Sequence, residues 1–296
     1  MIVRLRTAID EAYQAMLAGA HLPGEQYTEP VGDPGLFGPG SAIWKVHGDV
    51  SGVVGGVSGL LLGTLNEPVM YGTNRFSDYQ RDPIKRLGFT SSFVRGVTYG
   101  STQVADKLID TVRAMHRRVH GTMPDGRAFS ATDSADIVWT GATQAYSIAR
   151  AHLRYHPDPL RGAGLDRYYA DYAVISERLG AVDPPRSRAD VEDYLASMRP
   201  RLTVSEETVE TVHFLRAAYG ADPRSRVASL IVNRAATDLL PPWAKTLLGL
   251  QPRDPVSPLA TRAAAHLLIR ALRYGVRNRL IEQAYARTGG SVLPPG

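Results

Sequence analysis

Apolar residues recur at helical spacing through almost the whole of this 296-residue chain. They repeat at intervals of three and four, whereas the alternation of apolar and polar residues typical of a half-buried strand does not recur. Proline, glycine and aspartate cluster between the periodic segments, where they favour turns. The pattern predicts an all-α fold, a single multi-helix domain, with helices at about residues 2–19, 49–65, 83–99, 102–119, 134–155, 165–179, 188–198, 205–218, 224–238 and 257–287.

The turn-rich stretches divide the chain into three parts. We expect an N-terminal helix and loop over residues 1–40, a helical core over 41–245, and a linker with a long helix over 246–296. The last helix is amphipathic over residues 257–285. It is therefore a candidate for pairing two copies of the chain in a homodimer.

Composition excludes several classes of site and partner. The chain has no cysteine, which rules out disulfides, thiolate catalysis, and zinc or iron–sulfur sites built on cysteine. Its formal net charge of +5 is spread without a basic run or a nucleic-acid-binding motif, so we expect no nucleic-acid partner. The opening residues lack the apolar core of a signal peptide. The most apolar segment, 50–65, is shorter than the ~20 residues that span a membrane. We expect a cytoplasmic protein without a membrane span.

A stripe of glycines marks the segment 49–65. Gly52, Gly56, Gly59 and Gly63 follow one another at i, i+4, i+7 and i+11, which places them on one helix face. Each interior glycine costs about 1 kcal/mol relative to alanine, so four of them indicate that another group approaches the backbone closely. That group is either a tightly packed partner helix or a flat ligand, and the pattern leaves both open.

An arginine and a threonine lie on an apolar helix face in the segment 83–99. Arg86, Thr90, Phe93 and Val97 follow one another at i, i+4, i+7 and i+11. A cation on a buried face needs an anion or several hydrogen bonds. Arg86 therefore either reaches a carboxylate or water, or it faces a ligand with Thr90 one turn away.

Two histidines four residues apart end the predicted helix 102–119. His116 lies on the apolar stripe of this helix and is expected to be buried, whereas His120 precedes Gly121, a residue type that commonly ends helices. On this evidence His116 is either a hydrogen-bonded core residue or a ligand. The predicted stripe consists of Val104, Leu108, Val112, Met115 and Val119.

The surroundings of the pair favour one imidazole ligand over a two-histidine metal site. A zinc protease needs HExxH, and here Arg117 follows His116 in place of the glutamate. Haem needs one protein ligand, an apolar slot, and cations near its propionates. His116 would bind the iron, with His120 as the second choice. Gly56 and Gly59 would form one wall of the slot, and Arg117 would supply a cation.

Several motifs, taken in order, resemble the DUF2236 family of oxygenase MpaB-like proteins, which are related to the rubber-cleaving latex-clearing protein. The resemblance covers about residues 40–200, and three stretches carry it: NEPVMYGTNRFSDYQRDPIKRLGFTSSFVRGVTYGS (66–101), VRAMHRRVHGTMPDGRAFSATDSADIVWTGAT (112–143) and LDRYYADYAVISERLGA (165–181).

The resemblance implies an all-α core that binds haem b (iron protoporphyrin IX) in a pocket and uses O2. His116 matches the haem-ligating histidine of the family motif. Arg86 and Thr90 resemble polar residues on the open side of the haem, where they would polarise the oxidant or orient the substrate. Within this motif, the rubber oxygenases carry a lysine before the threonine, and that position is Phe89 here.

Two further positions depart from the family pattern. Asn66 replaces the histidine of a histidine–proline pair, and Gly141 replaces the histidine of a WVHAT motif. Any catalytic or haem-supporting role of those histidines is therefore missing or reassigned in this chain.

Together these features predict a haem b-dependent oxidoreductase or oxygenase. It would act on a hydrophobic or biosynthetic small molecule with O2 or peroxide. The alternative, favoured by Asn66 and Gly141, is a non-catalytic helical protein that binds haem or another apolar ligand. A third hypothesis is an oligomeric interaction protein in which the glycine stripe only packs helices.

Overall fold

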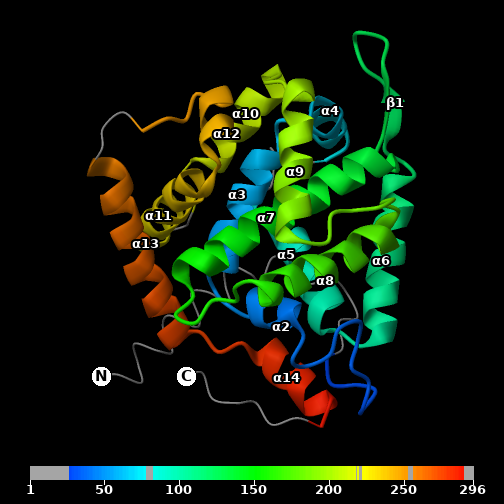
Figure 1. Cartoon of the computed structure of the whole chain (residues 1–296), viewed down its shortest axis with the longest axis vertical. Helices are drawn as coiled ribbons and strands as arrows, with labels where there is room; N and C mark the ends of the chain where they lie inside the picture. The colour runs from blue at the N-terminus through cyan, green and yellow to red at the C-terminus, as the bar shows by residue number, and fades with distance from the viewer. Residues whose placement is uncertain (1–26, 78–82, 218, 220–221, 253–255, 290–296) are drawn as a thin grey trace.

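A computed structural model describes residues 27–77, 83–217, 219, 222–252 and 256–289, without the side chains of residues 83–87 and 256. The predicted helix 2–19 lies outside this part of the chain. Apart from one two-stranded hairpin, the regular secondary structure of the described residues is helical, which confirms the all-α prediction (Figure 1). The elements are α2 (Ala42–His47), α3 (Gly52–Gly63), α4 (Glu67–Phe76), α5 (Pro83–Tyr99), α6 (Thr102–His116), β1 (His120–Thr122), β2 (Ala128–Ser130), α7 (Ser134–Tyr155), α8 (Ala163–Leu179), α9 (Arg188–Met198), the 3-10 turn η2 (Arg199–Arg201), α10 (Glu206–Leu215), α11 (Pro223–Leu239), α12 (Pro242–Leu247), α13 (Val256–Gly275) and α14 (Arg279–Arg287).

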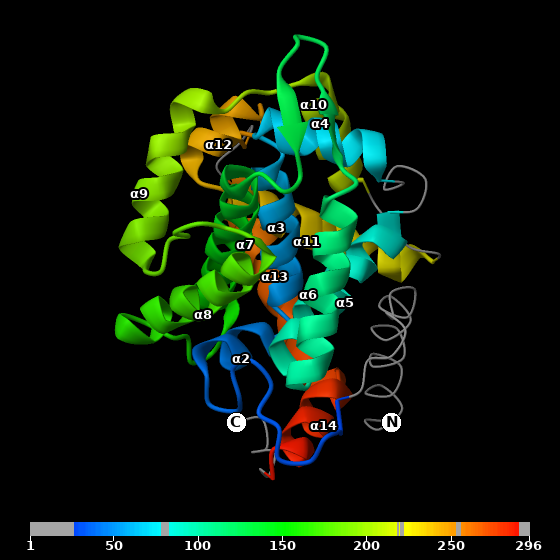
Figure 2. The same cartoon turned by 90° about the vertical axis from the view of Figure 1, so that its right-hand side faces the viewer.

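Helices α3 and α7 form the centre of the molecule. Helix α3 packs most extensively on α7, and α10 and α11 also pack against it (Figures 1 and 2). Trp139 of α7 is fully buried, and its indole Nε1 donates a hydrogen bond to the Gly63 carbonyl at 3.0 Å. Burying so much apolar surface around one helix pair is the main favourable term for such a fold.

The glycine stripe of α3 divides into packing positions and open positions. A Cβ on Gly59 would lie 2.8 Å from the Gln144 side chain, and one on the neighbouring Gly55 only 2.6 Å from the Ile148 Cα. The partner-helix explanation is therefore correct for these two glycines. At Gly52 and Gly56, a Cβ would meet no described atom within 4 Å.

The predicted helix boundaries are correct in several places and wrong in others. The segments 83–99, 134–155 and 188–198 match α5, α7 and α9 residue for residue. The short helices α2, α4 and α12 were not predicted. The predicted helix 257–287 is wrong, because the chain breaks after Gly275 and Asn278 caps a second helix by accepting a hydrogen bond from the Ile281 N–H at 3.4 Å.

A buried arginine at the C-terminal end fixes the turn between α5 and α6. Arg287 is 1% exposed and donates to the backbone carbonyls of Tyr27, Asp33 and Gly100 at 2.9, 2.8 and 3.1 Å. The Asp33 carboxylate in turn accepts from the backbone N–H and the hydroxyl of Thr102, at 3.0 and 2.8 Å. Segments from both ends of the described chain therefore meet where α6 begins.

Within the described residues, no single helix is both long and apolar enough to cross a membrane. Helices α3 and α4 reach the required length and composition only together, and they are bent by 107° relative to each other.

We predict that Gly55→Ala destabilises the protein, because the added methyl group must push α3 away from the backbone of α7. Overpacking of this kind costs roughly 1–3 kcal/mol. Urea denaturation should show this loss in the free energy of unfolding. Gly56→Ala is the matched control in the same helix, and its better helix propensity should leave stability unchanged or raise it by up to about 1 kcal/mol. Equal losses in the two variants would contradict the packing explanation.

Candidate functional site

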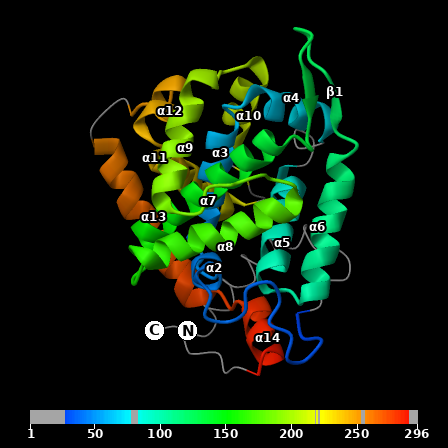
Figure 3. The same cartoon turned by 45° about the vertical axis from the view of Figure 1, so that its right-hand side comes forward.

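Helices α5 and α6 form an antiparallel hairpin that carries most of the predicted site residues (Figures 2 and 3). The tight turn needs Gly100, since a Cβ there would lie 2.4 Å from the Gly96 carbonyl oxygen. Ser101 then caps α6 by accepting a hydrogen bond from the Val104 N–H at 3.4 Å. Because the helices are antiparallel and similar in length, the first turn of α5 comes to the level of the last turn of α6. Arg86 and His116 lie at this end of the hairpin.

The two histidines do not share a helix face. Helix α6 ends at His116, one turn earlier than predicted, and His120 lies on strand β1 opposite Ser130 of β2. His120 is exposed, whereas His116 is half-buried with its Nδ1 atom shielded from solvent. The two residues are therefore not a pair of metal ligands on one helix.

The predicted apolar stripe of α6 is correct only in its first half. Leu108 is buried, together with its neighbours Ala105 and Ile109, whereas Met115 is 49% exposed. His116 was expected to be buried and is half-buried, because the last turn of α6 rises out of the core before the chain enters the hairpin β1–β2.

On α5, the predicted apolar face is present towards the C-terminal end. Val97 is fully buried and Phe93 is half-buried. Thr90, one turn earlier, is half-buried, and Phe89 is 36% exposed. The Arg86 side chain lies outside the described residues, so its predicted role stays a prediction.

The other residues predicted to contact a cofactor are Gly56, Gly59 and Arg117, and they differ in the space around them. Gly56 faces open space, whereas the space beside Gly59 is filled by the Gln144 side chain. Arg117 is exposed at the end of α6, beside a shallow surface depression that Lys107, Asp110 and Arg113 also line. Arg117 therefore belongs to the outer, basic face of this helix.

Asn66 has a structural role that its sequence context could have revealed. Its side-chain oxygen accepts a hydrogen bond from the Val69 N–H at 3.2 Å and so caps α4, as an asparagine before glutamate and proline commonly does. Its amide also donates to the Asp136 carboxylate at 3.1 Å. Burial raises the pKa of Asp136 to about 6, the Asn66 hydrogen bond opposes this shift, and the Asp133 charge adds to it.

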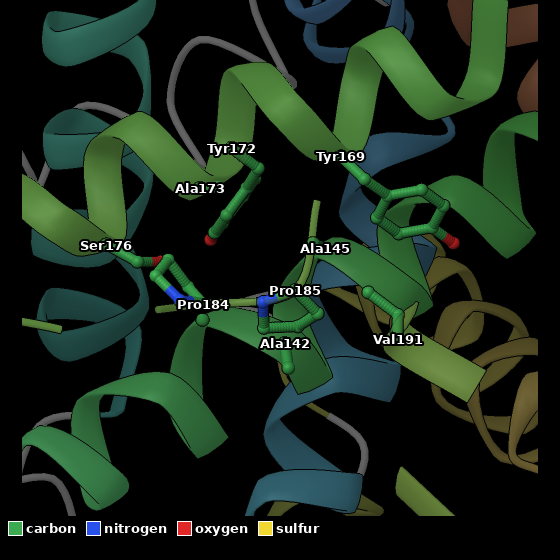
Figure 4. A pocket seen from close by; sticks show the side chains of 10 residues that line it. Ala142, Ala145, Tyr169, Tyr172, Ala173, Ser176, Pro184, Pro185 and Val191 are labelled. Atoms are coloured by element: carbon green, nitrogen blue, oxygen red, sulfur yellow. The ribbon is translucent and has the colours of Figure 1, made fainter. Parts of the chain in front are cut away.

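Gly141 lies beneath Ser176 of α8. A Cβ at this position would be 2.3 Å from the Ser176 hydroxyl oxygen and 3.9 Å from the Tyr172 ring. In Figure 4, Tyr172 and Ser176 extend from α8 toward α7 and Pro184. The residual cavity that they line with Gly141 is about 10 Å³, close to the smallest space that holds a water molecule.

His47 is a buried imidazole that sequence reasoning did not single out. Its Nδ1 lies 2.9 Å from the Thr98 hydroxyl, which itself donates to the Val94 carbonyl at 2.6 Å. Nδ1 therefore carries the proton, and Nε2 faces the Tyr168 hydroxyl at 3.4 Å. Burial lowers the pKa of His47 to about 3, so the ring is neutral and links α2 to α5 and α8.

Among the residues with described side chains, no group of three or more histidine, aspartate or glutamate side chains could hold a metal ion together. A metal that needs three protein ligands finds no such set there.

Asp136 should give the protein a distinctive pH dependence. Because its folded-state pKa of about 6 exceeds the ordinary 3.8, the folded protein binds more protons between these values. The resulting stabilisation is present below about pH 4 and is lost as the pH rises through about 6. The free energy of unfolding of Asp136→Asn lacks this pH-dependent loss. With allowance for the partial exposure of Asp136, we predict that the variant's free energy of unfolding, relative to that of the native protein, rises by on the order of 1–2 kcal/mol as the pH goes from about 4 to 7. Urea denaturation across this range measures it, with Asp110→Asn on the exposed face of α6 as the control. If the free energies of unfolding of the native protein and Asp136→Asn differ by the same amount at every pH in this range, the raised pKa of Asp136 is contradicted.

A comparison with protein families places this arrangement among known enzymes. Residues 44–274 match the model described as ER-bound oxygenase mpaB/B'/Rubber oxygenase, catalytic domain. The match includes α5, α6, the hairpin β1–β2 and the central pair α3 and α7. Comparisons with curated proteins and with solved structures give no match. Because the family model covers well over half of the sequence, the chain belongs to the family of the mpaB and rubber oxygenase catalytic domains.

Proposed function

We propose that this member of an oxygenase family is a haem b-dependent oxidoreductase, with His116 as the ligand of the haem iron. The haem, when bound, supplies a redox-active iron that activates O2 or peroxide. The substrate would be a hydrophobic or biosynthetic small molecule. The observation that carries the proposal is the position of His116, the only histidine of the α5–α6 hairpin, at the end where Arg86 also lies.

The surroundings of His116 suit this cofactor. His116 is half-buried at the end of α6, and its Nδ1 atom is shielded from solvent. Gly56 of the central helix has open space beside it. Arg113 and Arg117 are exposed basic residues within one turn of His116, where they would reach carboxylates at the edge of a bound haem.

Thr90 and Arg86 would act on the side of the pocket that receives the substrate. A threonine hydroxyl can donate a hydrogen bond to an oxygen atom on which negative charge develops, and a guanidinium can stabilise the same charge. Thr90 is half-buried on α5, where solvent competes less with a bound group than at a fully exposed position. The assignment of Arg86 rests on the family motif.

The alternative proposal is a helical protein that binds haem or another apolar ligand without turnover. Asn66 and Gly141 favour it, because they stand where the family pattern has histidines, and the structure has Asn66 as a helix cap and Gly141 packed against Ser176. Measurement of turnover separates the two proposals.

We predict that the purified protein, supplied with haem during expression, shows a Soret absorption band. His116→Ala should abolish this band, because it removes the proposed ligand of the haem iron. His120→Ala is the matched control and should largely keep the band, since His120 is exposed on β1. A protein that stays colourless after haem is supplied, or a band that depends on His120, would contradict the proposal.

Thr90→Val should separate binding from chemistry. We expect normal haem content, because Thr90 is not the iron ligand, but peroxide-dependent oxidation of a chromogenic phenol slowed by about a hundredfold, as for loss of one donor to a developing charge. Thr111→Val, an exposed position on α6, is the control and should retain full activity. If the native protein binds haem yet turns over neither O2 nor peroxide, the non-catalytic alternative holds.

A further inference from the structure

Helix α13 presents an apolar face that no described element covers. Leu259, Ala263, Leu267, Arg270 and Tyr274 follow one another at i, i+4, i+8, i+11 and i+15, and all five are exposed. Leu259 is 65% exposed, Leu267 68% and Tyr274 50%. Large apolar side chains are rarely this exposed along a single helix face without a partner.

This face lies at the edge of the molecule. In Figures 1 and 3, α13 runs along one side of the helical core, with α11 as its neighbour on the inner side. Its inner residues Ala265 and Ile269 are buried in the hydrophobic core. The outer face extends over the 16 residues from Leu259 to Tyr274, a length of about 22 Å. A flat surface can therefore contact the whole of it.

The charges of α13 indicate which partner fits. The helix contains three arginines and no aspartate or glutamate. Arg262 binds Asp238 and Arg273 binds Asp49, so both are engaged inside the protein. Arg270 is exposed, and within the described residues it forms no ion pair.

We propose that this face of α13 docks on an anionic lipid surface. Leucine side chains would enter the boundary between headgroups and acyl chains, as in amphipathic helices that lie in the membrane plane. Tyr274 suits the same depth, because its ring is apolar and its hydroxyl is polar. Arg270 would extend its apolar stem along the leucines and place its guanidinium among lipid phosphates.

A second copy of the chain is a poorer partner on charge grounds. Pairing two α13 helices would bring together two faces that each carry Arg270 and no carboxylate. An acidic protein would pair with Arg270 but would leave Leu259 and Leu267 against polar groups. A surface that is both apolar and anionic can contact the leucines and pair with Arg270 at the same time. The proposal does not depend on haem binding, so it stands or falls separately from the proposed function.

Flotation of the full chain with lipid vesicles tests the docking. The native protein should float with vesicles of phosphatidylcholine and phosphatidylglycerol and less with phosphatidylcholine alone, and added salt should weaken binding. Leu259→Glu combined with Leu267→Glu should lower the vesicle-bound fraction about tenfold or more, because charge is excluded from the acyl region. Arg270→Gln should lower the bound fraction about fivefold on the anionic vesicles and change it little on the neutral ones.

A control with the same charge change shows whether the face itself matters. Val182→Glu combined with Val209→Glu alters two exposed apolar residues elsewhere, 73% and 58% exposed, and should leave flotation unchanged. Circular dichroism verifies that each variant is folded. Three results would overturn the proposal: no flotation of the native protein, an equal loss in the control, or a native dimer without lipid that the α13 double variant converts to monomers.

Discussion

The near-contact of two backbones, at Gly55 of α3 and Ile148 of α7, sets the spacing on which the other helices depend. A glycine in a helix interior destabilises the helix by about 1 kcal/mol relative to alanine. The close packing of α3 on α7 that the glycines allow must stabilise the fold by more than this cost. The approach also lets Trp139 reach the Gly63 carbonyl and so satisfies an indole N–H that would otherwise be buried without a partner. Any residue larger than glycine at position 55 would move α7, and with it α8 and α9, which pack on α7.

The α5–α6 hairpin is fixed at one end and carries its candidate site at the other. At the turn, Arg287 donates hydrogen bonds to three backbone carbonyls, including that of Gly100. The Asp33 carboxylate adds two hydrogen bonds to Thr102. A buried guanidinium held by several carbonyls is costly to disturb, because removing it leaves all of those acceptors unsatisfied. Residues 33 and 287 both lie outside the family match over 44–274, so flanking segments of this chain position the helices that carry His116 and Thr90.

Local signals predicted those elements whose ends are set by nearby residues. Helix α9 begins at a capping box between Ser187 and Asp190, and α7 begins after Asp133, which accepts from the Ala135 N–H at 2.8 Å. The end of α6 was predicted three residues too late, because the chain leaves the helix to pair β1 with β2, and next to these strands the Ala131 N–H donates to the Val119 carbonyl at 2.8 Å. A periodicity that continues to Val119 carries no information about that pairing.

The site could be predicted only in part for the same reason. His116 was selected from its position on a helix and from the family motif, and no long-range contact was needed for that choice. His47 and Asp136 were missed because their partners, Thr98 and Asn66, lie 51 and 70 residues away in the sequence. The capping role of Asn66 could have been read from the glutamate and proline that follow it, since the bond to Val69 is local.

The two positions that depart from the family pattern are integrated into the structure. Asn66 uses its oxygen to cap α4 and its nitrogen to bind Asp136, and an imidazole would have to place an unprotonated nitrogen and an N–H in the same two directions to replace it. Gly141 admits the Ser176 hydroxyl into the space that any side chain would occupy. Restoring a histidine at position 141 would therefore require α8 to move away from α7 and would separate Tyr172 from the cavity beside it. In this chain both positions are occupied by the capping, hydrogen-bonding and packing contacts of the residues present.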